Sequence, residues 1–113
     1  MGAIFTALIF TTSAVMEIFG AYTFWIWLRE GHTKWLLIPG IISLIAFALL
    51  LTRIDTAFAG RAFAAYGGFY IVMSLIWLWL IEAKQPDRWD LLGGSICLIG
   101  AAVIIFSPRE NLI

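Results

Sequence analysis

The chain has 113 residues, of which 63% are hydrophobic and only 12% are charged. Soluble domains have about 45–50% apolar and about 25% charged residues, and a chain this short has too little interior to bury the excess. Seven basic residues balance seven acidic ones, and there is one histidine and one cysteine, which disfavours a nucleic-acid partner, a metal site and an internal disulfide. We therefore expect a membrane protein in contact with the lipid bilayer, without a metal or cofactor.

Four long apolar segments alternate with short charged ones. The segments expected to be helices are residues 3–28, 35–52, 62–81 and 91–107. Each has the roughly 17–25 residues that a helix needs to cross the hydrocarbon core. Short polar links between them predict an all-α fold, a four-transmembrane-helix up-and-down bundle that forms one integral membrane domain over residues 1–113. The apolar run of the first segment is too long for a signal peptide, so we expect it to be retained.

Segment 3–28 contains one charged residue, Glu17, near its middle. A carboxylate at that depth costs roughly 2.5–3.5 kcal/mol on insertion scales, and such residues usually face the interior of a bundle and mark an ion or proton path. We therefore expect Glu17 to bind and release a proton. The alternative is a structural ion pair between Glu17 and Arg53 or Arg61. Counting residues along the helices, however, puts Arg61 about 13 Å nearer than Glu17 to the opposite membrane surface.

Small residues lie on the same helix face as Glu17, with Ser13 four residues before it and Gly20 three residues after it. They leave space for a ligand or permit close helix contact. At matching depth, segment 62–81 carries aromatic residues at helical spacing. Rings beside a carboxylate suit an organic cation, whereas ordinary packing is the alternative. The predicted proton and substrate site consists of Glu17, Ser13, Gly20, Phe63, Tyr66 and Tyr70.

The last segment, 91–107, has no charged residue and carries Gly93 and Gly100 seven residues apart on one face. Because small residues let helices approach closely in lipid, we expect this face to form the contact of a homodimer. Packing of the same face against the chain's own helices is the alternative.

Basic residues are divided almost evenly between the two predicted sides of the membrane. One side carries Arg53, Arg61 and Arg109, and the other carries Arg29, Lys34, Lys84 and Arg88. Since an excess of cations sets orientation, three against four predicts dual topology and an antiparallel dimer; a small bias that still fixes one topology is the alternative. All the tryptophans lie beside the two loops at residues 29–34 and 82–90, which share one side of the membrane. They predict an interfacial belt on that side: Trp25, Trp27, Trp35, Trp77, Trp79 and Trp89.

Three short runs of residues resemble those of a known family. Gly60-Arg61 with Ala64-Ala65-Tyr66-Gly67-Gly68, together with Glu17-Ile18-Phe19-Gly20, resembles the YnfA family of small bacterial inner-membrane proteins. That family is similar in size and layout to the small multidrug resistance transporters, four-helix antiparallel dual-topology dimers that exchange protons for aromatic cations. The resemblance implies a homodimer in the cell inner membrane that binds protons and small organic cations.

The resemblance to the transporters also implies roles for single positions. The matches are the embedded glutamate and the glycine after it, two substrate-facing aromatic positions and two dimer glycines: Glu17, Gly20, Phe63, Tyr66, Gly93 and Gly100. Tyr70 stands where the transporters have a glycine, and loop 53–61 is shorter than theirs. The resemblance therefore indicates a class of mechanism and leaves the substrate open.

Three functions are consistent with these residues. The leading hypothesis is a proton-coupled efflux transporter of small cationic or aromatic organic compounds. The alternatives are a small dual-topology ion channel, which would need a longer polar path, and a non-transporting membrane protein that stabilises a partner complex. We do not expect an enzyme, because one embedded carboxylate and one loop histidine, without a paired nucleophile, do not form a reaction centre.

Overall fold

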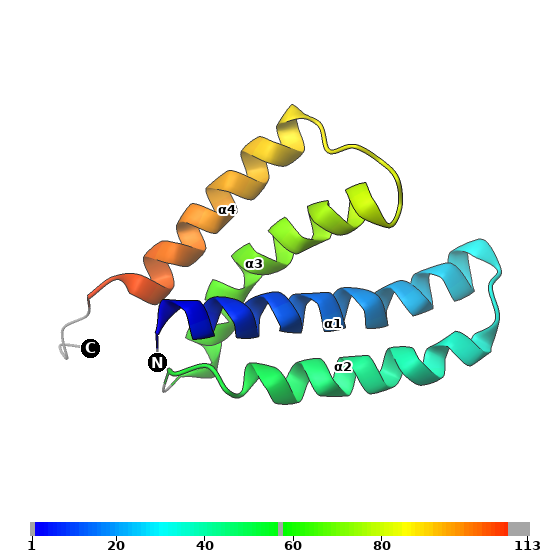
Figure 1. Cartoon of the computed structure of the whole chain (residues 1–113), viewed down its shortest axis with the longest axis horizontal. Coiled ribbons are helices and arrows are strands. Elements are labelled where there is room, and N and C mark those ends of the chain that lie inside the picture. Colours follow the sequence, from blue (N-terminus) through cyan, green and yellow to red (C-terminus); the bar gives the residue numbers. More distant parts are fainter. Residues whose placement is uncertain (1, 57, 109–113) are drawn as a thin grey trace. The chain divides into compact units, whose positions relative to one another are not determined.

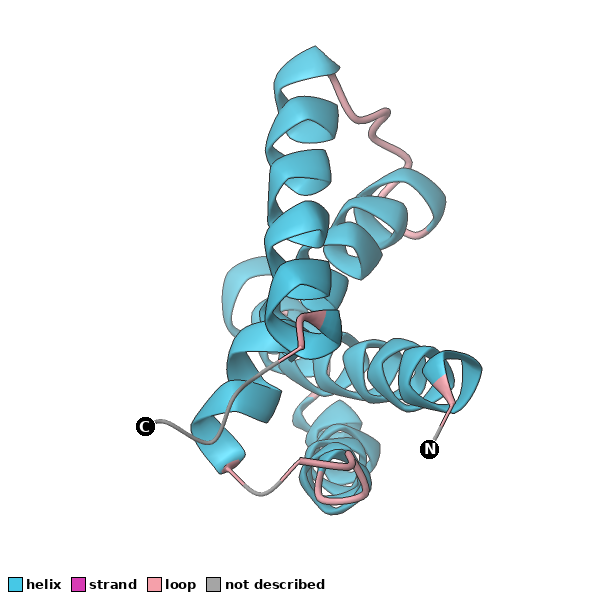
Figure 2. Ribbon diagram, turned by 90° about the vertical axis from the view of Figure 1, so that its left-hand side faces the viewer, coloured by secondary structure: helices cyan, strands magenta, loops and turns pink. Residues whose placement is uncertain are grey.

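The structure is a computed structural model, and it describes residues 2–56 and 58–108. This part of the chain contains four α-helices: α1 (Ala3–Glu30), α2 (Leu37–Leu51), α3 (Ala59–Leu80) and α4 (Arg88–Phe106) (Figure 1). A short 3₁₀ helix, η1 (Lys34–Leu36), leads into α2. The described residues contain no strand (Figure 2). The predicted all-α fold of four helices is confirmed.

All four helices can span a membrane. Each is long and apolar enough to cross one when η1 is counted with α2. Large apolar side chains are exposed along their surfaces, as on α2, where Ile42, Ile45 and Leu49 are each more than half exposed. In water this apolar surface would favour aggregation, whereas in a bilayer the same side chains meet lipid chains of their own polarity.

The helices pack as two separate hairpins. Helix α1 pairs with α2 in one compact unit, and α3 pairs with α4 in the other. Within each hairpin the two helices lie side by side and run in opposite directions (Figure 1). The short links predicted between the apolar segments permit this pairing, because a few residues suffice to join the ends of adjacent antiparallel helices.

Local capping explains where the helices end. Helix α1 continues to Glu30, two residues beyond the predicted segment, and stops at Gly31, whose φ of 74° is in the left-handed region that glycine tolerates. Helix α4 begins three residues before its predicted segment, at Arg88. There, the Asp90 N–H donates to the Asp87 carboxylate at 2.9 Å and the Asp87 N–H donates to Asp90 at 3.0 Å, a capping box.

The first hairpin is held by close backbone contact. A Cβ added at Gly20 would lie 2.8 Å from the Gly40 carbonyl oxygen and 2.5 Å from Leu44 Cγ, and a Cβ added at Gly40 would overlap the Thr23 side chain. Ser43 of α2 also donates its hydroxyl to the Met16 carbonyl of α1 at 2.7 Å. Small residues and hydroxyls are the features that let helices associate without a hydrophobic drive.

The second hairpin uses the same device with different residues. A Cβ added at Gly68 of α3 would lie 2.7 Å from the Cys97 carbonyl oxygen and 2.5 Å from Ala101 Cβ. A Cβ added at Gly94 of α4 would lie 3.0 Å from Leu75. The two backbones therefore meet where neither helix has a bulky side chain.

Candidate functional site

Glu17 is half-buried at the middle of α1. The backbone on both sides of it is held against α2: the Met16 carbonyl accepts the Ser43 hydroxyl, and Gly20 lies against Gly40. Because these contacts come directly before Glu17 and one turn after it, they set the position and rotation of α1 at the carboxyl-bearing residue. The hairpin thus holds a single ionisable side chain at a defined depth.

The small residues beside Glu17 differ in their surroundings. Gly20 is buried and makes the close helix contact with α2. Ser13 is also fully buried, and within residues 2–56 and 58–108 its hydroxyl has no hydrogen-bond partner. Phe10, one turn before Ser13, is fully buried as well. The part of Gly20 and Ser13 in a ligand site stays a prediction.

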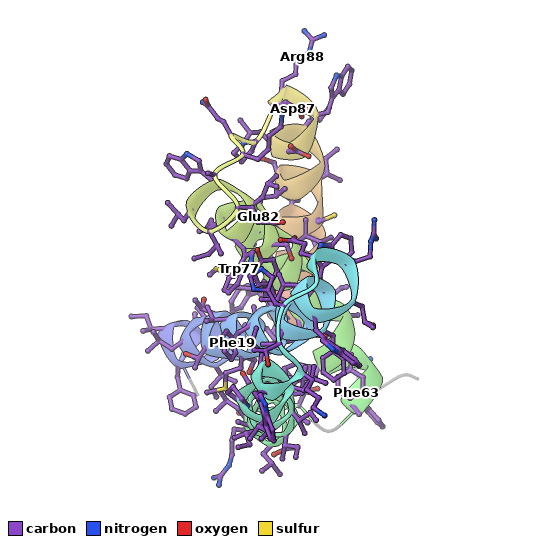
Figure 3. All side chains as sticks on the ribbon, turned by 90° about the vertical axis from the view of Figure 1, so that its right-hand side faces the viewer. Phe19, Phe63, Trp77, Glu82, Asp87 and Arg88 are labelled. Carbon is purple, nitrogen blue, oxygen red and sulfur yellow. The ribbon has the colours of Figure 1, made fainter. Side chains whose placement is uncertain are left out.

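The three aromatic residues predicted on α3 do not share one environment. Tyr66 is buried and Tyr70 is half-buried, and their rings meet edge to face with centroids 6.1 Å apart and an interplanar angle of 63°. Phe63 is 57% exposed and lies on the outside of α3 (Figure 3). The structure therefore brings Tyr66 and Tyr70 together and leaves Phe63 apart. A site that combines these rings with Glu17 stays a prediction.

Helix α4 has two different faces of small residues. Gly94 and Ala101 are buried and face α3. Gly93 and Gly100 are exposed, and a Cβ added at either would have nothing within 4 Å. Packing inside the hairpin thus uses one face, and the face predicted to bind a second copy is left uncovered within the described chain. The dimer role of Gly93 and Gly100 stays a prediction.

Several basic side chains stack on aromatic rings near the helix ends. Arg29 lies 4.7 Å from the centroid of the Trp25 ring, and Arg88, which extends beyond the start of α4 (Figure 3), lies 5.2 Å from that of Trp89. At the opposite end of its hairpin, Arg61 lies 5.6 Å from the centroid of Phe58. Such pairs suit the interface between headgroups and lipid chains, where cations and indole rings both anchor. Arg109, which the charge count also used, lies outside the described residues.

A groove of about 340 Å³ lies between α3 and α4. Its lining is mostly apolar and consists of Val72, Leu75, Ile76, Trp79, Pro86, Leu91, Gly94, Ser95 and Leu98. None of the predicted site residues borders it. Hydrocarbon surfaces without charge suit lipid chains better than a cation, so this groove does not replace Glu17 as the candidate site.

Sequence reasoning missed the hydroxyl groups that join the helices of the first hairpin. Ser43 donates to Met16 across the hairpin, and Thr23 donates to the Gly20 carbonyl at 2.7 Å while its side chain lies against Gly40. The sequence does not indicate which way the side chain of a single serine or threonine in an apolar run points. Small residues were the available sign of a close contact: Gly20 of α1, and Gly40 near the start of α2.

The helices and their apolar surfaces define a multi-pass integral membrane protein with one carboxyl group at the middle of a spanning helix. Comparison with known proteins narrows this class. The family described as "Uncharacterised BCR, YnfA/UPF0060 family" matches residues 3–110. This chain belongs to the YnfA/UPF0060 family, which confirms the resemblance seen in the sequence.

Two relatives support the assignment, and both carry the name UPF0060 membrane protein. The one from Methylocella silvestris is 57% identical over 104 residues, which cover 92% of this chain and 96% of the relative. The one from Ectopseudomonas mendocina is 56% identical over 100 residues, which cover 88% of this chain and 91% of the relative. No solved structure matches the chain.

Proposed function

We propose that this protein is a proton-coupled efflux transporter of small cationic or aromatic organic compounds in the cell inner membrane. The observation that carries the proposal is Glu17, a carboxyl group half-buried at the middle of a helix that can span a bilayer. Keeping an ionisable group at that depth is costly, and intramembrane carboxylates serve proton and ion pathways in pumps and transporters. No catalytic role forms part of the proposal.

Coupling follows from the chemistry of one carboxyl group. A charged carboxylate in a low-dielectric site attracts an organic cation strongly, and a proton on the same oxygen atoms removes that attraction. Glu17 therefore binds either a proton or the substrate at one time. Proton entry from the acidic side then releases the cation there, and loss of the proton on the other side restores the site.

The aromatic residues of α3 supply the second element of the proposal. Ring faces attract organic cations, and the attraction is larger where water is excluded. We expect Tyr66 and Tyr70, whose rings already pack edge to face, to contribute such faces together with Phe63. The resemblance to the small multidrug resistance transporters supports this role at Phe63 and Tyr66.

The proposed active form is an antiparallel homodimer of dual topology. The nearly even division of basic residues supports insertion in both orientations. The open space beside Gly93 and Gly100 supports a contact with a second copy along α4. Such a dimer would hold two Glu17 side chains, one from each copy.

The proposal is tested with purified protein in liposomes that carry a pH gradient. Methyltriphenylphosphonium and ethidium serve as probe cations, and uphill movement of the probe is recorded together with proton release when the probe is added. Glu17→Gln keeps the size of the side chain but cannot exchange a proton, so it should abolish both signals. Glu30→Gln makes the same change at an exposed residue at the end of α1 and should leave both intact.

Two results would overturn the proposal. Uphill movement of either probe by the Glu17→Gln protein would show that coupling does not pass through this carboxyl group. If neither probe causes the unaltered protein to release protons, the proposed class of substrate is excluded.

A further inference from the structure

The Ser13 hydroxyl differs from the other serine hydroxyls inside the helices. Ser43, Ser74 and Ser95 each donate to a backbone carbonyl oxygen at 2.7 to 2.8 Å. Ser13 is fully buried, and no group in residues 2–56 and 58–108 forms a hydrogen bond with its Oγ. A buried hydroxyl without a partner costs free energy, so its presence calls for an explanation such as a functional role.

Helix geometry points to Glu17 as that partner. Ser13 and Glu17 are four residues apart and share a face of α1. Side chains in a helix lean toward its N-terminus, so the Glu17 carboxyl group extends over the turn that carries Ser13. A hydroxyl can donate a hydrogen bond, whereas a charged carboxylate can only accept one, so the two groups are complementary when Glu17 is charged.

Within α1 and α2, the charged side chains other than Glu17 lie at one end of α1. Helix α2 has no titratable side chain between Leu37 and Leu51. On α1, Arg29 and Glu30 lie twelve and thirteen residues beyond Glu17, about 18 Å along the helix axis. Tyr22, five residues beyond Glu17, lies on another face.

The nearby hydroxyls of this hairpin are already committed. Ser43 donates to the Met16 carbonyl, and Thr23 donates to the Gly20 carbonyl. The Ser43 bond joins α2 to α1, so breaking it would loosen the hairpin. The Thr23 bond stays within α1 and holds the side chain that lies against Gly40. Ser13 can turn to Glu17 without giving up a hydrogen bond.

We propose that Ser13 is a positioning residue that donates a hydrogen bond to the charged Glu17 carboxylate during the exchange of proton and cation. The inference rests on the transport function proposed above and adds the group that sets its pH range. The hydrogen bond stabilises the charged form of Glu17, holds its oxygen atoms in one orientation toward the substrate, and is weakened when the carboxyl group takes up a proton.

The test follows Glu17 directly and needs no substrate. Infrared difference spectra of the purified protein record the carbonyl band of protonated carboxyl groups as the pH is raised, and subtraction of the Glu17→Gln spectra isolates the band of Glu17. Ser13→Ala removes one oxygen atom without a partner, so the protein should fold normally. The pH at which the Glu17 band is half lost should rise by about one unit, a tenfold gain in proton affinity.

Ser95→Ala is the matched control, because this exposed hydroxyl donates only to the Leu91 carbonyl of its own helix. It should leave the midpoint of the Glu17 band unchanged. A midpoint that stays in place in Ser13→Ala, or that moves equally in Ser95→Ala, would overturn the role of Ser13 while leaving the transport proposal intact. If the Glu17→Gln subtraction shows no band that changes with pH, the transport proposal itself fails.

Discussion

Two adjacent glycines of α3 give opposite predictions for the same substitution. A Cβ added at Gly68 would lie 2.7 Å from the Cys97 carbonyl oxygen and 2.5 Å from Ala101 Cβ, whereas one added at Gly67 would have nothing within 4 Å. The Cys97 contact is with backbone, which cannot turn aside as a flexible side chain can. Gly68→Ala must therefore push α4 away from α3, and Gly67→Ala need not move anything.

The difference between the two variants measures this close approach. Replacing glycine by alanine inside a helix gains roughly 0.5–1 kcal/mol. Both variants share that gain, so it cancels in the comparison. Overpacking of a close contact typically costs about 1–3 kcal/mol. We expect Gly67→Ala to be as stable as the unaltered protein or slightly more stable, and Gly68→Ala to unfold more easily than Gly67→Ala by about 1–3 kcal/mol.

The assay is reversible unfolding by a denaturing detergent in mixed micelles, followed by tryptophan fluorescence. The six tryptophans report on both hairpins, and hydrogen exchange of the α3 and α4 amides assigns the loss to the second hairpin. Equal unfolding free energies for Gly67→Ala and Gly68→Ala would refute the reasoning, because they would mean that the α3 and α4 backbones are not in contact at Gly68.

Two further predictions concern the first hairpin and α4. Ser43→Ala removes the hydrogen bond to the Met16 carbonyl and should lower the unfolding free energy by about 0.6 kcal/mol, a typical value for such bonds in membranes. The Ser74 hydroxyl donates within its own helix, so Ser74→Ala should lower the unfolding free energy less in the same detergent titration. Gly100→Leu fills the open face of α4 and should leave the protein inserted but monomeric in mild detergent. A dimeric Gly100→Leu protein that still transports would place the contact between copies elsewhere.

The composition and the charge pattern predicted the helices correctly because the signal is local. A run of apolar residues long enough to cross hydrocarbon can satisfy its backbone only as a helix, whatever its neighbours are. The exact ends were less predictable, since they depend on capping. The last helix was predicted to begin at residue 91 but begins at Arg88, because Asp87 and Asp90 accept hydrogen bonds from each other's N–H groups. The pattern of apolar residues does not predict such a capping box.

The candidate site could be predicted only in part. Glu17 was evident because a charge in an apolar helix contradicts its surroundings. The proposed role of Ser13 as a hydrogen-bond donor to Glu17 was less evident from the sequence. Three other serines of the helices donate to backbone carbonyls, and only the structure shows that Ser13 does not. The exposure of Phe63 beside the buried Tyr66 was also unavailable, because helical spacing groups residues on one stripe without saying what covers each of them.

The sequence by itself determined that this protein lies in a membrane, that it crosses as helices and that one carboxyl group lies at the middle of the first. Only the tertiary structure decided which small residues form contacts: Gly94 rather than Gly93, and Gly68 rather than Gly67. Neighbouring residues of a helix point about 100° apart, so the choice between them depends on the rotation of the helix against its partner. That rotation is set by all the contacts of the hairpin together, and no single stretch of sequence contains it.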